Sequence, residues 1–469
     1  MLFPTFDFLL FFLAVAVALA VLAGRHAWQK RVLVAASYFF YAQWNWRFCF
    51  LLAGSSALTW IGGLALERQA APGRRRIVVG CVAGLHLFVL GIFKYSDFFV
   101  GSANDLARLL GMHREIPFIE IILPVGISFF TFHGISYIVD VYRRDVAVCR
   151  GLTDMLLYLS FFPQLVAGPI VRAAFFLPQL YASSRQPIML APAVVLILGG
   201  LFKKVVLATF LATELVDPVF FDPTRFGTVD LLLAMYGYAA QIFCDFSAYS
   251  DMAIGLAALM GYRFPQNFDQ PYRAQRLREF WRRWHISLSS WLRDYLYKPL
   301  GGSRRGAWRT NINLALTMLL GGLWHGAAWK FIMWGALHGG GLMIERALLP
   351  VIGERSRSRA GRILSVLVVF HLVCVAWIFF RAENFATAWD YLGQLLTPTM
   401  AIERTTPFTL ALVVLALSLH AIPRDIGRRV ADFLEPWPRW ALGALGGVFV
   451  VAIDALGPDG VAPFIYFQF

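Results

Sequence analysis

Charged residues are scarce in this 469-residue chain, because Asp, Glu, Lys and Arg make up 15% of it while hydrophobic residues make up 59%. Soluble globular domains carry charge on about a quarter of their residues. The mean hydropathy is +0.63, and apolar runs recur along the whole length. The shortage of charge excludes a soluble globular protein and indicates a polytopic membrane protein.

Other signatures are also lacking. The five cysteines stand alone and form no C-x-x-C pair or other metal-ligand spacing, so we expect neither a disulfide framework nor a metal site. The chain has no G-x-S-x-G elbow and no phosphate loop. These gaps remove the serine-hydrolase and nucleotide-hydrolase motifs from consideration.

Long apolar runs begin with Phe6 to Gly24, which is long enough to cross a bilayer. It has no basic region before it and no small-residue cleavage site, so we expect a retained first transmembrane helix. The apolar runs together predict eleven to thirteen membrane segments, helical because lipid offers open backbone no partner. The further runs lie at about 32–50, 51–66, 77–93, 117–139, 152–171, 190–212, 229–260, 311–323, 327–345, 363–380, 407–422 and 438–456.

The predicted fold class is therefore an all-α polytopic membrane protein, with residues 1–469 forming a single transmembrane domain. The run at 311–323 is short and ends in glycines, which suggests a re-entrant helix. Pro124-Val125-Gly126 predicts a broken helix near 117–139. Non-helical backbone at membrane depth implies a cavity lined by protein.

The net charge of +14 comes from basic residues in the loops between apolar runs, which is typical of the positive-inside rule and not of nucleic-acid binding. Arg25, Lys30 and Arg31 place the first loop in the cytoplasm and the amino terminus outside. The loop 263–309 has eleven Arg and Lys against three acidic residues, so it is also expected in the cytoplasm. The same alternation places the tail 457–469 outside.

That cytoplasmic loop alternates arginine with tryptophan. Guanidinium forks suit phosphates and indole faces stack on a purine, so the loop is a candidate site for an acyl-coenzyme A donor. An interfacial amphipathic helix is the alternative explanation. The candidate donor-binding residues are Arg276, Arg278, Trp281, Arg282, Arg283, Trp284 and Arg293.

Two histidines are candidate catalytic residues. His325 stands in the apolar run Leu314 to Gly341, with glycines at 321, 322 and 326 leaving room for close approach and Trp324 as an apolar wall. Loss of hydration there favours the neutral imidazole, which could act as a general base on a hydroxyl attacking a thioester. The alternative is a helix-packing histidine bonded to a carbonyl, the role considered for His338, His371 and His420. His285 precedes Ser289 by four residues, so on a helix the two would share a face.

At these residues the chain resembles the membrane-bound O-acyltransferase (MBOAT) family, and within it the branch of the bacterial alginate O-acetylation membrane protein (AlgI-like). Relatives in this branch serve peptidoglycan and cellulose acetylation. The likeness spans nearly the whole chain. The stretches that carry it are 123–129 (LPVGISF), 162–170 (FPQLVAGPI), 241–302 and 322–326 (GLWHG).

This resemblance implies a ring of helices around a thinned centre with a tunnel for the acyl group. It also implies that His325 is the family's essential histidine and that His285 is its second signature position, which in many relatives is Asn or Asp. The implied donor is acetyl-coenzyme A, with no permanently bound cofactor. The implied acceptor is a periplasmic or membrane-anchored SGNH-type O-acetyltransferase, which esterifies an extracellular polysaccharide and which this chain does not itself contain.

The carboxyl-terminal residues 464–469 read F-x-Y-x-x-F. They resemble the motif of the small peptide that relays D-alanine in teichoic acid modification, which would make Tyr466 an acyl relay. An aromatic anchor at the membrane interface is the alternative.

Two other functions remain open at this stage. Another family branch would acylate a lipid or protein hydroxyl, for which long-chain acyl specificity would be diagnostic. A polymer or lipid transporter should show two related halves with paired broken helices. Here the polar features cluster once, between 241 and 326.

Overall fold

The computed structural model describes residues 3–112, 116–118, 121–182, 187–355 and 358–458. Over these residues the chain forms helices and turns and no β-strand, which confirms the predicted all-α fold class. It divides into two compact units. The first contains Met1–Ile188 and Met260–Phe264, and the second contains Met189–Leu259 and Pro265–Phe469.

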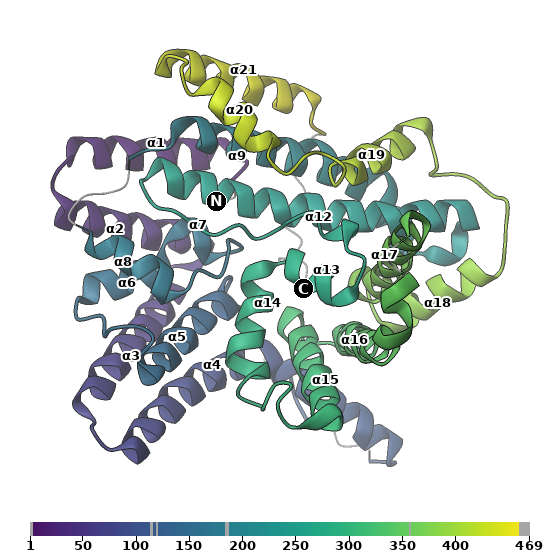
Figure 1. Ribbon diagram of the computed structural model, residues 1–469, viewed down its shortest axis with the longest axis horizontal. Coiled ribbons are helices and arrows are strands. Elements are labelled where there is room, and N and C mark those ends of the chain that lie inside the picture. Colours follow the sequence, from purple (N-terminus) through teal and green to yellow (C-terminus); the bar gives the residue numbers. More distant parts are fainter. Residues whose placement is uncertain (1–2, 113–115, 119–120, 183–186, 356–357, 459–469) are drawn as a thin grey trace. The chain divides into compact units, whose positions relative to one another are not determined.

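The first unit contains Pro124-Val125-Gly126, where a broken helix is predicted. Residues 121–126 are not helical, so the described part of this stretch shows the beginning of a helix and no helix before it. Gly126 has a φ of 76°, in the left-handed region that favours glycine, and α5 (Ile127–Arg143) begins at the next residue. A Cβ added to Gly126 would also collide with the carbonyl oxygen of Leu165. The other helices of this unit are α1 (Phe6–Val21), α2 (His26–Asn45), α3 (Phe48–Arg68), α4 (Pro72–Leu109), α6 (Leu152–Ser160), α7 (Phe162–Leu165) and α8 (Ala173–Tyr181) (Figure 1).

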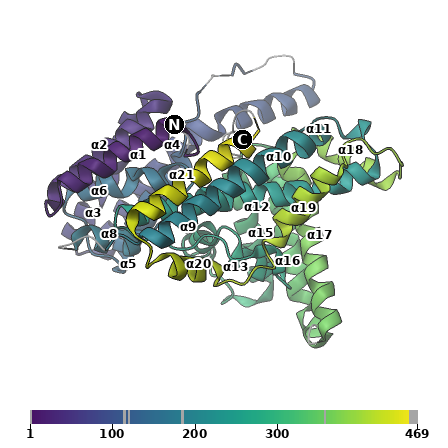
Figure 2. The same cartoon turned by 90° about the horizontal axis from the view of Figure 1, so that it is seen from above.

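The second unit is built around α12 (Thr228–Leu259). In the most apolar 18-residue stretch of this helix, 83% of the residues are buried. Helix α9 (Leu190–Leu201) runs beside it (Figures 1 and 2). Glycines allow this close contact. A Cβ added to Gly200 would lie 2.9 Å from the Ala248 carbonyl oxygen, and one added to Gly255 would lie 3.0 Å from the Ala193 carbonyl oxygen.

The remaining α-helices of the second unit include the elements that carry the candidate site. They are α10 (Thr209–Leu211), α11 (Asp217–Phe221), α13 (Leu277–Arg283), α14 (Ile286–Leu292), α15 (Gly306–His325), α16 (Trp329–Arg355), α17 (Arg359–Arg381), α18 (Phe385–Leu396), α19 (Pro407–Ser418), α20 (Ile426–Leu434) and α21 (Arg439–Leu456).

Two lysines in this unit form ion pairs with acidic residues of α12. Lys204 of the π-helical turn Phe202–Ala208 lies 2.8 Å from Asp245 of α12, and both side chains are 4% exposed. Lys203 of the same turn lies 2.6 Å from Asp251. Breaking a buried pair leaves an uncompensated charge at a cost of about 3–5 kcal/mol. The acidic residues of the 241–251 stretch therefore have a structural role, which the sequence alone did not show.

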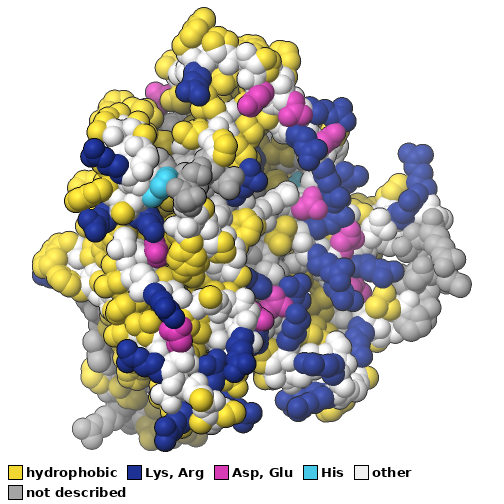
Figure 3. All heavy atoms as spheres, turned by 60° about the vertical axis from the view of Figure 1, so that its left-hand side comes forward, with side chains coloured by type: hydrophobic (Ala, Val, Ile, Leu, Met, Phe, Trp, Pro, Cys, Tyr) yellow, Lys and Arg dark blue, Asp and Glu magenta, His cyan; other side chains and the backbone are white. Residues whose placement is uncertain are grey.

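Six helices among the described residues are long and apolar enough to cross a membrane, and α1 and α19 are shorter apolar helices. The six spans are Phe48–Arg68, Pro72–Leu109, Leu190–Phe221, Thr228–Leu259, Arg359–Arg381 and Arg439–Leu456. In α4 and α21 only 17% and 11% of the most apolar 18-residue stretch is buried inside the protein. Lipid must therefore cover the rest of these helices. Figure 3 shows broad apolar areas on the surface, with Lys and Arg side chains gathered between them. The chain is a multi-pass membrane protein.

Candidate active site

His325 is the last residue of α15, because Gly326 takes an extended conformation (φ −161°, ψ 151°) that ends the helix. Helix α16 follows at once and packs against α15. A Cβ on Gly322 would collide with the Phe331 carbonyl oxygen and lie 3.3 Å from the Gly335 Cα. The glycine before His325 therefore permits the close approach predicted from the sequence.

The His325 side chain is 4% exposed and aromatic rings surround it. Its ring centroid lies 5.0 Å from Trp324 on the same helix, which confirms the predicted apolar wall. Trp334 of α16 and Phe380 of α17 make T-shaped contacts with it, at ring-centroid distances of 4.9 and 5.2 Å. Three helices thus enclose the imidazole in an aromatic, water-poor environment.

His285 lies between α13 and α14, in the left-handed conformation (φ 41°) and fully buried. The prediction that it shares a helix face with Ser289 is wrong, because His285 is outside the helix and the Ser289 hydroxyl donates to the Trp284 carbonyl instead. The Nδ1 atom of His285 lies 3.3 Å from the Asn267 Oδ1 and 3.4 Å from the Ser287 Oγ.

Asn267 fixes the tautomer of His285. Its Oδ1 accepts from the Ser287 backbone N–H at 3.1 Å, and its Nδ2 donates to the Ser250 Oγ of α12 at 3.0 Å, so the amide orientation is determined. Because an amide oxygen only accepts, Nδ1 of His285 carries the proton and Nε2 is the basic nitrogen. Nε2 has no hydrogen-bond partner among the described residues. Burial also lowers the pKa of His285 to about 3, so the ring is neutral at physiological pH.

The two histidines share one neighbour, since the Trp324 ring lies 6.1 Å from His285 and 5.0 Å from His325. The structure therefore brings together both predicted catalytic residues in the second unit. A neutral imidazole with an uncommitted nitrogen is suited to accept a proton or a hydrogen bond from a reacting hydroxyl.

A third histidine, which the sequence suggested only as a helix-packing residue bonded to a carbonyl, lies in the same aromatic region. His338 of α16 is 1% exposed and, unlike His371 and His420, is not bonded to a carbonyl. Its ring contacts Trp334 at 4.7 Å and Trp281 at 5.0 Å, and it stacks on Phe280 at 6.1 Å. Trp334 thus connects His338 with His325. The sequence did contain one indication of this contact, since Trp334 and His338 are four residues apart and therefore share a face of the helix.

Several polar atoms of this aromatic region have no hydrogen-bond partner among the described residues. They are both ring nitrogens of His338 and the indole nitrogens of Trp281 and Trp334. Buried polar atoms are nearly always satisfied in folded proteins. A substrate oxygen, either carbonyl or hydroxyl, would find donors and acceptors here beside His325.

Four of the five predicted donor-binding arginines are exposed. Arg276, Arg278 and Arg282 are exposed, and Arg293 is also exposed and pairs with Asp294 through two contacts of 2.9 Å. The first turn of α13 is capped by Glu345, which accepts from the backbone N–H groups of residues 277 and 278.

The tryptophans of the predicted donor loop face inward, which is not the arrangement of an interfacial amphipathic helix. Trp284 is 2% exposed and stacks on Phe280 at 5.6 Å. Trp281 is half-buried beside His338. Neither face of Trp284 is open to a purine, so the stacking part of the donor hypothesis finds no support at that residue.

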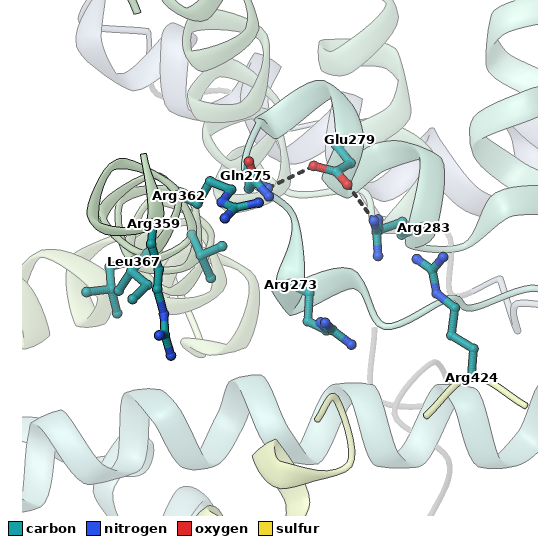
Figure 4. A pocket seen from close by; sticks show the side chains of 10 residues that line it. Arg273, Gln275, Glu279, Arg283, Arg359, Arg362, Leu367 and Arg424 are labelled. Carbon is teal, nitrogen blue, oxygen red and sulfur yellow. Dashed lines mark hydrogen bonds and ion pairs between the residues drawn. The ribbon is translucent and has the colours of Figure 1, made fainter. Parts of the chain in front are cut away.

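Arg283 is the member of the predicted donor set that lines a cavity of about 840 Å³ on the second unit. Arginines from three separate segments surround this cavity (Figure 4). The other lining residues are Arg273, Gln275, Glu279, Arg359, Arg362, Ile363, Val366, Leu367 and Arg424.

No group of three or more His, Cys, Asp or Glu side chains in the described part of the chain could hold a metal ion. Tyr466 lies outside the described residues, so its predicted role as a relay stays a prediction.

With this fold and this pair of histidines, the chain belongs to the membrane-bound O-acyltransferase (MBOAT) family, whose pattern matches residues 150–389. It is a membrane-bound O-acyltransferase. It is similar to "Probable alginate O-acetylase AlgI" of Pseudomonas aeruginosa, at 45% identity over 83% of this chain and 74% of that protein. The protein of the same name from Azotobacter vinelandii is 43% identical over 100% of both chains. The peptidoglycan O-acetyltransferase of Helicobacter pylori is 36% identical over 76% of this chain and 72% of its own.

Proposed function

We propose that this acyltransferase takes acetyl from acetyl-coenzyme A at the cytoplasmic face of a bacterial inner membrane. It passes the acetyl group to an SGNH-type partner at the periplasmic face, for O-acetylation of an extracellular polysaccharide. Both termini would then be periplasmic, as the loop charges predict. The observation that carries the proposal is the His285–Trp324–His325 arrangement, in which the neutral, oriented imidazole of His285 and the predicted catalytic His325 both contact the Trp324 ring.

The proposed chemistry is general-base acyl transfer. The acceptor oxygen attacks the thioester carbonyl, a C–O bond forms, and the C–S bond breaks. His325 takes the proton of the attacking hydroxyl and returns it to the departing thiolate. Trp324, Trp334 and Phe380 exclude water, so hydrolysis of the thioester does not compete. His285, oriented by Asn267, is proposed to hold the hydroxyl or to share the proton.

The polymer is proposed from the relatives' names, which specify alginate and peptidoglycan acetylation. Alginate or a cellulose-like polysaccharide is preferred over peptidoglycan because the alginate enzymes match at higher identity and coverage. The acyl group could reach the partner through Tyr466. The change Tyr466→Phe keeps the aromatic bulk and removes the nucleophile, so near-normal acetylation in this variant would reject the relay.

Transport assays on membrane vesicles test the proposal. Acetyl-coenzyme A labelled in the acetyl group is supplied to inverted vesicles, which expose the cytoplasmic face, and to right-side-out vesicles, with the partner and polymer present. We expect ester-linked label only when the donor meets the cytoplasmic face. Equal incorporation from either face would contradict the proposed direction.

The second candidate is acylation of a lipid or protein hydroxyl. The aromatic rings around His325 form apolar surroundings, which suit a long acyl chain as well as an acetyl group. Competition in the same vesicles between acetyl-coenzyme A and a long-chain acyl-coenzyme A decides between them. Preference for the long chain would favour this alternative.

A further inference from the structure

The cavity of about 840 Å³ on the second unit is lined by five arginines and one acidic residue. Arg273 precedes α13 and Arg283 ends it, Arg359 and Arg362 belong to the first turn of α17, and Arg424 lies between α19 and α20. Figure 4 shows Arg359 and Arg362 on one side, Arg283 and Arg424 on the other, and Arg273 between them. Three segments that are far apart in the sequence thus converge on one basic cavity.

The positive charge of this cavity is only partly compensated by the protein. Arg283 pairs with Glu279, and Arg424 lies 2.9 Å from Asp269. Arg273 bonds neutral groups, the side-chain oxygen of Gln270 and the carbonyl of His420. Arg359 and Arg362 have no ion pair within the described residues. Like charges at this density repel one another, and a bound polyanion would relieve that repulsion.

The lining also has an apolar side. Ile363, Val366 and Leu367 follow the two arginines on α17 and form one wall of the cavity. The volume lies within the range of about 300–1,000 Å³ found for small-molecule sites. A guanidinium group binds two phosphate oxygens at once. A single carboxylate would pair with only one of the five arginines. The lining therefore fits a molecule that has several phosphate oxygens and an apolar part.

The cavity adjoins the active-site region through α13. Glu279 and Arg283, one turn apart, face the cavity, whereas Phe280 and Trp281 of the same helix contact His338. His338 in turn contacts Trp334, which touches His325. A ligand in the cavity would therefore bind against the helix that closes the aromatic region.

We propose that this cavity is a binding site for a ligand with two or more phosphate charges, and that Arg359 and Arg362 are principal phosphate contacts. If the proposed function holds, the ligand is the nucleotide end of the acyl-coenzyme A donor. The headgroup of an anionic phospholipid offers the same chemistry. The loop residues Arg276, Arg278, Arg282 and Arg293 lie outside this site.

Ligand binding without turnover tests the site. Full-length protein in detergent is titrated with coenzyme A, which has the phosphates but no acetyl group, in the wild type and in Arg359→Gln/Arg362→Gln. The matched control is Arg304→Gln/Arg305→Gln, which also removes two exposed arginines, from outside the cavity. Gel filtration and thermal melting verify that each variant is folded.

We expect the cavity variant to bind coenzyme A at least about tenfold more weakly, since one charge-assisted contact is worth roughly that factor, and the control to stay within about twofold. Wild-type affinity should fall as salt rises. Equal coenzyme A affinity in all three proteins would exclude the donor as the ligand.

A second titration distinguishes the lipid source, using nanodiscs of phosphatidylcholine with or without phosphatidylglycerol. If the cavity variant loses phosphatidylglycerol binding but keeps coenzyme A binding, the phosphate site stands and its ligand is lipid. If neither probe distinguishes the cavity variant from its control, the site is refuted. A wild type that binds coenzyme A through these arginines but never transfers acetyl from it would instead refute the proposed function alone.

Discussion

At the scale of single residues, the sequence located the two histidines but not the contacts that determine their chemistry. Glycines and an adjacent tryptophan around His325 pointed to an apolar, tightly packed site, and the structure places Trp324, Trp334 and Phe380 there. The tautomer of His285 depends on Asn267, 18 residues earlier. No local periodicity relates the two, because the residues between them form a loop and then α13, and His285 itself has a left-handed φ.

The change Asn267→Asp tests the neutral state of His285. In the wild type, burial lowers the pKa of His285 to about 3, so the ring stays neutral between pH 6 and 8 and does not itself limit the rate there. A carboxylate at position 267 opposes that shift and raises the pKa of His285, so the ring becomes protonated as the pH falls. We expect kcat/KM of the variant to be depressed at the acidic end and to recover as the pH rises.

The matched control for this change is Asn384→Asp, at the N-cap of α18, where aspartate caps as well as asparagine. Its pH profile should follow that of the wild type. A profile of Asn267→Asp that also matched the wild type would show that His285 takes no part in the rate-limiting step.

At the scale of elements, glycine positions determine how α15 and α16 pack. The sequence indicated that Gly322 leaves room, but not what fills it. The structure shows the backbone of α16 there, at Phe331 and Gly335. Likewise Gly126, in the stretch where a helix break is predicted, has a left-handed φ and directly precedes α5, so it marks where a helix begins. Local rules find such glycines, whereas their partners follow from tertiary packing.

The change Gly322→Ala should therefore disrupt the active site through the backbone. The added methyl group overlaps the Phe331 carbonyl, so α15 and α16 must separate, and we expect a loss of about 1–3 kcal/mol in stability together with reduced transfer. Thermal unfolding in detergent and the vesicle assay measure both. Gly340→Ala on α16 is the control, because nothing lies within 4 Å of its added Cβ. Equal melting temperatures for the two variants would contradict this packing argument.

At the scale of the whole molecule, composition and apolar runs predicted a multi-pass all-α protein, and the motifs predicted the family, both of which are confirmed. The number of crossings stays a prediction. In the described part of the chain six helices meet the length and hydropathy of a span, and other apolar runs there form shorter or more polar helices. Such helices are stabilised by burial against other helices, which hydropathy alone does not reveal.

The proposed phosphate-binding cavity shows the same limit of sequence reasoning. A run of arginines in one loop suggested a single contiguous site, but only Arg283 of that set lines the basic cavity. The other four arginines of the cavity come from positions 273, 359, 362 and 424. Their convergence depends on the packing of α13, α17 and the segment after α19, so no motif could have grouped them.

The central claim is that His325 is the base of an acetyl transfer to an extracellular polysaccharide. The most direct measurement is the acetyl ester content of that polysaccharide from strains expressing wild type, His325→Ala or His371→Ala at equal membrane levels. His371 is an exposed histidine on α17 with both ring nitrogens bonded, so it controls for the loss of an imidazole. General-base catalysis is worth about 10²–10⁴ in rate, so His325→Ala should reduce acetylation to background while His371→Ala retains most of it. Wild-type acetyl content in the His325→Ala strain would contradict the account.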